Sequence, residues 1–191
     1  GMASGKSTAA RYLGSLGAHV IDADQLGHRV YEPGTPGLIA VAAAFGEDII
    51  GADGQIDRKV LGSKVFGKPD ELKRLTDIVW PQIRRLAHED IAAAKATDAS
   101  KPIIVEAAVL FEAGWDDVGE EVWVVIAEPR TAIERAVARD GLDDEAVRKR
   151  LDAQLSNEER TARADVVFDN NGDPALLETK LAEHYARITG A

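Results

Sequence analysis

The chain opens with the stretch Gly1-Met2-Ala3-Ser4-Gly5-Lys6-Ser7-Thr8. Its second half matches the end of a phosphate-binding motif, in which a glycine and four free positions precede Gly-Lys-Ser/Thr. In this motif glycine lets backbone N–H groups turn towards phosphate oxygens, the lysine supplies a positive charge, and the hydroxyl suits a Mg²⁺ ligand. A helix opening at the lysine directs its positive dipole end at the same anion. We therefore predict that these eight residues bind nucleotide phosphates.

The motif lacks its usual beginning. Its first glycine would lie one position before Gly1, and the strand that normally leads into such a loop would come earlier still. Gly1-Met2 is also typical of a protease scar followed by an assigned start codon. We therefore expect a gap beside the strand predicted for residues 18–21, with unpaired backbone groups on both sides. A glycine-serine turn before an ordinary helix is the alternative interpretation of so short a motif.

Composition limits the class of protein. The chain has 191 residues, of which 45% are hydrophobic and 29% are charged, as in an ordinary globular domain. Its net charge of −10 argues against a general nucleic-acid or anionic-membrane binder. The absence of cysteine excludes disulfides, thiolate nucleophiles and cysteine-ligated zinc. Without a long apolar run or signal-peptide character, a cytoplasmic protein without a membrane segment is expected.

Apolar periodicity predicts strands that alternate with helices. Strands are expected at residues 18–21, 102–107, 121–126 and 166–168, the second and third of them fully buried. The predicted helices cover residues 6–16, 25–31, 35–45, 58–66, 69–94, 129–139 and 143–154, a short helix capped by Ser156 and Glu159, and a terminal helix from Asp173. This alternation indicates an α/β layered domain with a parallel sheet.

Three details of the helices are predicted as well. Pro81 lies inside the helix of residues 69–94 and is expected to kink it. Helical spacing places Leu72 and Ile188 on buried faces. The Ala-rich stretch of residues 92–99 is expected to form a mobile loop.

Acidic side chains follow two of the predicted strands. Asp22-Ala23-Asp24 comes at the end of the first strand, and Glu106 ends the second. Ligands of open α/β sheets bind at the carboxyl ends of strands, where a carboxylate can orient or deprotonate a substrate hydroxyl. A carboxylate after a buried strand can also hold Mg²⁺ or its waters, although many such strands carry no metal. Each aspartate could instead cap the next helix, an alternative that weighs more for Asp22 than for Asp24.

Arginines concentrate in one polar helical segment, at positions Arg135, Arg139, Arg148, Arg150, Arg160 and Arg163. A mobile helical flap that carries arginines can clamp transferring phosphates and exclude water. Most of these side chains are expected to be solvated charges in weak surface pairs. We expect Arg139 to be functional, and either Arg148 or Arg160 to assist it.

Taken together, the motifs resemble the dephospho-CoA kinase family along essentially the whole chain. The resemblance rests on the following segments: Ala3-Ser4-Gly5-Lys6-Ser7-Thr8, Leu16-Gly17, Val20-Ile21-Asp22-Ala23-Asp24, Glu32-Pro33-Gly34-Thr35-Pro36, Phe45-Gly46, Asp53-Gly54, Arg58, Leu61, Val65-Phe66, Leu110-Phe111-Glu112, Arg139-Asp140 and Asp169-Asn170. Residues 28–29, 58–63 and 76–81 look most similar to the kinase half of bifunctional coenzyme A synthases.

The resemblance implies a three-layer fold like that of P-loop nucleoside kinases, in one domain over residues 1–191. A helical acceptor-binding region would cover about residues 31–95, and a helical lid about residues 139–164. The implied reaction is ATP-dependent phosphorylation of the ribose 3′-hydroxyl of dephospho-CoA, the last step of coenzyme A synthesis.

The resemblance also implies roles for single residues. Asp24 would be the catalytic base. Lys6 would serve the phosphates of ATP, with Mg²⁺ held by Ser7 and Glu106. Arg139 would belong to the lid over ATP, and Asp169-Asn170 would lie in the adenine-side loop.

This chain departs from the pattern of many members, which carry aspartate at Glu106, proline at Ala108 and histidine at Trp80. Glu106 keeps the charge with one more methylene, and the changes are expected to be tolerable.

Two alternatives are weighed against this resemblance. One is another small-molecule kinase, such as a nucleoside monophosphate kinase, against which the Asp22-Ala23-Asp24 stretch and the Glu32-Pro33-Gly34 loop argue. The other is a nucleotide-binding module without catalysis, against which the retained Lys6, Ser7 and Asp24 argue.

Overall fold

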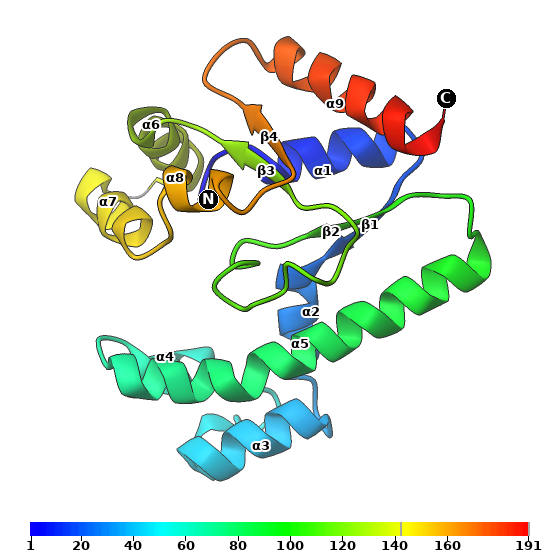
Figure 1. The fold of residues 1–191 in the computed structure, drawn as a ribbon. Coiled ribbons are helices and arrows are strands. Elements are labelled where there is room, and N and C mark those ends of the chain that lie inside the picture. Colours follow the sequence, from blue (N-terminus) through cyan, green and yellow to red (C-terminus); the bar gives the residue numbers. More distant parts are fainter. Residues whose placement is uncertain (142, 191) are drawn as a thin grey trace. The chain divides into compact units, whose positions relative to one another are not determined.

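The computed structural model describes residues 1–141 and 143–190 (Figure 1). The chain forms two compact units, one made of Gly1–Ile21 and Ala92–Ala191, and the other of Asp22–Ile91. The strands described below lie in the first unit, except for the last residue of the first strand, whereas the second unit is built from helices and turns. Both helices and strands are therefore present, as the periodicity predicts.

The strands form two hydrogen-bonded pairs. β1 (His19–Asp22) pairs with β2 (Ile103–Glu106), and the His19 N–H donates to the Pro102 carbonyl at 2.8 Å. β3 (Trp123–Ile126) runs parallel to β4 (Val166–Asp169), with Trp123 opposite Val166. Among the described residues, no ladder joins the two pairs into one sheet. In the described residues β1 is hydrogen-bonded to β2, and neither strand of this pair bonds to β3 or β4.

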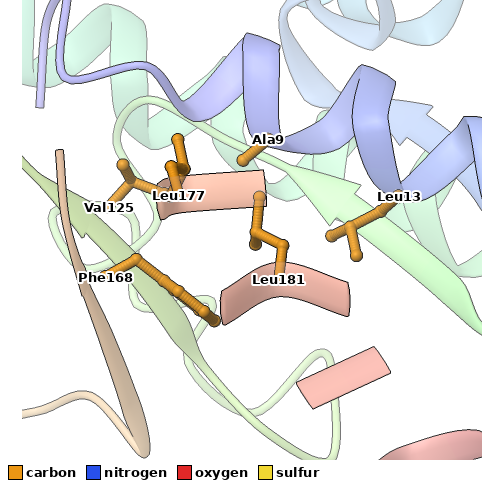
Figure 2. Packing of buried hydrophobic residues seen from close by; sticks show 6 residues of the cluster. All are labelled: Ala9, Leu13, Val125, Phe168, Leu177 and Leu181. Carbon is orange, nitrogen blue, oxygen red and sulfur yellow. The ribbon is translucent and has the colours of Figure 1, made fainter. Parts of the chain in front are cut away.

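Two helices cover the core of the first unit. α1 (Lys6–Ser15) and α9 (Pro174–Thr189) both present apolar side chains at helical spacing. Figure 2 shows how these side chains gather with those of β3 and β4 in one buried cluster: Ala9, Leu13, Val125, Phe168, Leu177 and Leu181. Burial of each large apolar side chain contributes roughly 1.5–3 kcal/mol, so this cluster holds α1 firmly against the strands.

Three further helices complete the first unit. They are α6 (Pro129–Asp140), α7 (Asp144–Asp152) and α8 (Asn157–Thr161). Ile133 and Ala136 of α6 pack with Val147 of α7. Met2 and Ala3 of the predicted phosphate loop (residues 1–8) pack against the same cluster. The predicted capping box is confirmed at the start of α8, where Ser156 and Glu159 exchange hydrogen bonds. The first residues of the loop thus share a core with α6 and α7.

The second unit contains α2 (Ala23–Arg29), α3 (Pro36–Phe45), the 3₁₀ turn η1 (Glu47–Ile49), α4 (Arg58–Val65) and most of α5 (Pro69–Thr97). Thr35 caps α3 as predicted, because its hydroxyl accepts from the Leu38 N–H at 3.2 Å. Asp57 caps α4 in the same way. Among the described residues, no helix is both long and apolar enough to cross a membrane.

Several details predicted from the sequence are wrong. Residues 92–97 continue α5 instead of forming a loop, because alanine is the strongest helix former. Leu72 is 50% exposed and Ile188 is 39% exposed, although the helical spacing placed both inside. β2 is only half-buried along its length. Pro81 does lie inside α5, as the sequence predicts.

Candidate active site

The phosphate loop turns sharply just before α1. Gly5, the residue that precedes the helix, has a φ of 103°, and Ala3 has a φ of 53°. Both values lie in the left-handed region, which glycine adopts freely and alanine adopts at a cost. Ser4 between them is buried, and its hydroxyl donates to the Gly1 carbonyl at 3.0 Å. The loop therefore folds back on itself and is held by its own polar groups.

The structure brings three predicted site residues together at the end of this loop. The Lys6 Nζ atom lies 3.2 Å from Glu106 Oε1, and the Ser7 hydroxyl donates a hydrogen bond to the same oxygen. The side chains of Lys6 and Glu106 are only 26% and 12% exposed. Glu106 ends β2 and the other two residues begin α1, so packing of this helix on that strand creates the cluster. A cation, a hydroxyl and a carboxylate are thus in contact at a partly buried position.

The cluster fits a magnesium ion that is mostly held by its substrate. Over residues 1–141 and 143–190, no group of three or more His, Asp or Glu side chains could hold a metal ion. Mg²⁺ commonly keeps several waters and takes one or two protein oxygens together with phosphate oxygens. The Ser7 hydroxyl and the Glu106 carboxylate are two such oxygen donors in direct contact. The donor set therefore suits Mg²⁺ bound with a nucleotide.

Asp169 and Asn170, which the resemblance placed at the adenine side, lie at the end of β4. The Asn170 side chain is buried and its Nδ2 donates to the Ser4 carbonyl at 2.8 Å. Asp169 instead accepts from Asn171, both from its N–H and from its amide at 2.8 Å. Of the two residues, Asn170 thus touches the phosphate loop, and Asp169 shapes the turn that follows the strand.

A second set of contacts, which includes Arg160, reaches the start of the loop. Gln154 Oε1 accepts from the Met2 N–H at 3.0 Å and from Arg160 at 3.3 Å. The Arg160 side chain is only 7% exposed, and its guanidinium lies 3.7 Å from Glu112. The sequence drew attention to Glu112, which belongs to the Leu110-Phe111-Glu112 motif. No sequence motif pointed to Gln154.

Two of the other arginines that we singled out, Arg139 and Arg148, lie on the surface. Arg139, near the end of α6, donates two hydrogen bonds to Asp140 at 2.7 and 2.8 Å, and its side chain is 62% exposed. These bonds are the main cause of a lowered pKa of Asp140. Arg148 pairs with Asp144 on the exposed face of α7. Neither arginine lies in the cluster around Glu106.

Asp22, the last residue of β1, and Asp24 differ clearly in their roles. Asp22 accepts hydrogen bonds from the Asp24 and Gln25 N–H groups, at 2.8 and 3.3 Å, and so caps α2. Asp24 lies in the first turn of that helix and is exposed. The capping alternative considered for Asp22 is therefore confirmed. Both residues belong to the second compact unit.

Comparisons with known proteins identify the relatives of this chain. A sequence profile described as dephospho-CoA kinase matches residues 1–175. The dephospho-CoA kinase of Geobacter sulfurreducens is 47% identical over 188 residues, which cover 98% of this chain and 94% of the relative. That of Thermobifida fusca is 39% identical over 188 residues, covering 98% and 92% of the two chains.

Solved structures have the same fold. A crystal structure from Thermus thermophilus shares 35% identity with a TM-score of 0.82, over 99% of this chain and 94% of the other. A dephospho-CoA kinase from Campylobacter jejuni shares 28% identity with a TM-score of 0.72, over the same 99% and 94%. These likenesses confirm the predicted α/β fold class.

Proposed function

The chain belongs to the dephospho-CoA kinase family, and from this premise we propose that it transfers the γ-phosphoryl group of ATP to the ribose 3′-hydroxyl of dephospho-CoA. The γ-phosphorus separates from the bridging oxygen of ADP and bonds to the 3′ oxygen, which gives up its proton. The products are ADP and coenzyme A. The observation that carries the proposal is the phosphate loop whose lysine and serine both contact one carboxylate.

The donor side of the reaction would be served by this cluster. Transfer of a phosphoryl group depends mainly on positioning and on stabilisation of charge. Entering phosphates would compete with Glu106 for the Lys6 ammonium, which a point charge on a flexible stem allows. Magnesium would neutralise phosphate charge here, with Ser7 and Glu106 holding it directly or through water. The N–H groups at the start of α1 would bind the same oxygens.

The acceptor side would be served by Asp24. This carboxylate follows the carboxyl end of β1, the part of a strand where ligands of open α/β sheets bind. It would accept the proton of the 3′-hydroxyl as phosphorus approaches. Asp22 caps α2, whereas Asp24 is exposed in the first turn of that helix, which makes Asp24 the better candidate of the two.

The helices of the second unit would bind the rest of dephospho-CoA, in the region of about residues 31–95. The segment of about residues 139–164 would act as a lid, with Arg139 stabilising the transferring phosphate. Its ion pair with Asp140 is exposed, so little free energy opposes its exchange for a phosphate oxygen. The net charge of −10 argues against nucleic acid as a partner, whereas a local cationic site would bind small anionic substrates. The cytoplasm is the proposed place of action.

A comparison of two phosphate acceptors tests the proposal. The chain is incubated with ATP and Mg²⁺ and either dephospho-CoA or AMP, and ADP formation is followed for each acceptor. We expect rapid turnover with dephospho-CoA, little with AMP, and a strong loss of both binding and turnover in Lys6→Ala. Phosphorylation of AMP alone would identify a nucleoside monophosphate kinase, and nucleotide binding without any transfer would identify a non-catalytic module.

A further inference from the structure

Asn170 holds the phosphate loop by its backbone. Its Nδ2 donates to the Ser4 carbonyl at 2.8 Å, across 166 positions of sequence. Ser4 and Asn170 are only 3% and 7% exposed, so this bond is shielded from water. A hydrogen bond in such a place resists exchange with solvent, and an unpaired carbonyl there would be costly. The bond therefore fixes the peptide that directly precedes Gly5.

Gly5 is shaped to receive this amide. A Cβ atom built on Gly5 would lie 2.2 Å from Asn170 Nδ2, closer than any real contact. The glycine is also the residue with a φ of 103° that starts α1. Its missing side chain thus serves two purposes, since it permits the left-handed turn and admits the amide that holds the turn.

Asn170 is itself fixed from both sides. Its N–H donates to the Ile126 carbonyl at 2.9 Å, which extends the parallel pairing of β3 and β4 by one bond. The next residue, Asn171, donates to Asp169 and accepts from the Glu128 N–H at 2.6 Å. The amide of Asn170 therefore projects from a braced strand end and has little freedom to move.

We infer that Asn170 is a positioning residue for phosphate transfer, which orients the phosphate loop through the Ser4 carbonyl without contacting the adenine. This inference rests on the proposed function and deepens it. Fixing the peptide before Gly5 aims the N–H groups of Gly5 and Lys6 before ATP arrives. Preorganised donors stabilise developing charge without reorganisation during the reaction. The family resemblance had suggested the adenine side for this position.

The two roles predict different losses of affinity. Mutation of a residue that positions the loop weakens the affinity for every ligand with phosphates, including a ligand without a base. Mutation of a residue that contacts adenine weakens the affinity for adenosine and leaves the affinity for inorganic tripolyphosphate unchanged. Asn170→Asp keeps the size of the side chain but sets a carboxylate against the Ser4 carbonyl, and Asn170→Ala removes the amide.

The experiment measures the affinities of tripolyphosphate, adenosine and ATP for the wild-type chain and both variants by calorimetry. We expect tripolyphosphate and ATP to bind about tenfold or more weakly in both variants, with adenosine unchanged. In turnover assays the KM for ATP should rise and kcat should fall, whereas the KM for dephospho-CoA should stay constant. Weaker binding of adenosine alone would overturn the inference.

A stability control separates positioning from general loosening of the fold. Leu181→Val thins the same core that supports α1 and should lower the melting temperature while leaving tripolyphosphate affinity unchanged. If both Asn170 variants unfold, or if Leu181→Val weakens tripolyphosphate equally, Asn170 has only a structural role. If the wild type binds tripolyphosphate but does not phosphorylate dephospho-CoA, the proposed function fails and the positioning role still stands.

Discussion

The Lys6 ammonium lies 3.2 Å from the Glu106 carboxylate, and the two form an ion pair where α1 meets the end of β2. The Ser7 hydroxyl bonds to the same carboxylate oxygen. One side chain thus holds both groups that would meet the phosphates and Mg²⁺. Because Glu106 balances the lysine before nucleotide binds, its charge is expected to matter for magnesium as well as for the loop.

Glu106→Gln should weaken the apparent affinity for Mg²⁺ while the loop stays folded. The amide can still accept from Ser7, but it lacks the negative charge that attracts the metal. We expect the Mg²⁺ concentration for half-maximal rate to rise by roughly 10–100-fold, the range seen when groups that support a metal are removed. Initial rates measured across a Mg²⁺ titration check this. Glu106→Asp should keep most of the activity, and a wild-type Mg²⁺ titration curve for Glu106→Gln would exclude a metal role.

Asp24→Asn and Asp22→Asn form a matched pair. Asp24→Asn should lower kcat by roughly 10²–10⁴-fold with nearly unchanged ATP affinity, because a positioned base contributes that much. Asp22→Asn should remain active, since asparagine caps a helix about as well as aspartate. Steady-state kinetics of both variants with dephospho-CoA decide the matter. Equal losses of kcat in the two variants would remove Asp24 from the role of base.

Ala3→Gly should not cost stability. Ala3 has a φ of 53°, a conformation that costs a residue with a Cβ about 1–2 kcal/mol, partly offset by the greater flexibility of unfolded glycine. We expect the free energy of unfolding to rise by up to about 1 kcal/mol in urea titrations. The matched change Gly5→Ala should do the opposite, because it meets both an unfavourable φ and the Asn170 amide. A large loss of stability in Ala3→Gly would contradict this account of the loop.

Acid should weaken the fold through Glu121. Hydrogen bonds from Arg187 and Trp123 lower the pKa of this carboxyl from 4.5 to about 2. The ionised form is therefore favoured in the folded state, and its stabilisation is complete above pH 4.5 and disappears as the pH falls from 4.5 towards 2. In Glu121→Gln, the free energy of unfolding should fall less steeply with pH in this range. Urea titrations at several pH values test this, and Arg187→Gln should show the same shallower slope.

Local signals in the sequence were reliable where their causes were local. The Lys6–Ser7 helix start, the Thr35 cap and the Ser156–Glu159 capping box each depend on residues within one turn, and the structure has all of them. The loop predicted for residues 92–99 was wrong because alanine favours helix, and α5 continues to Thr97.

Long-range contacts could not be predicted in the same way. No pattern within a single sequence connects Asn170 with Ser4, or Gln154 with Met2, because folding alone brings these residues together. The hydrogen-bonded pairing of strands is equally non-local, so the sequence alone does not show which strands are neighbours. The residues of the cluster around Glu106 could be predicted because each of them ends or begins a strand or helix that the sequence indicates.

The product of a single turnover shows whether the chain phosphorylates dephospho-CoA. Enzyme in excess is mixed with dephospho-CoA, Mg²⁺ and ATP labelled at the γ-phosphate, and the products are separated and examined by phosphorus NMR and mass spectrometry. We expect one labelled phosphate ester on the ribose 3′ oxygen, formed together with ADP. Label that appears only as inorganic phosphate, or on AMP when both acceptors are offered, would contradict it.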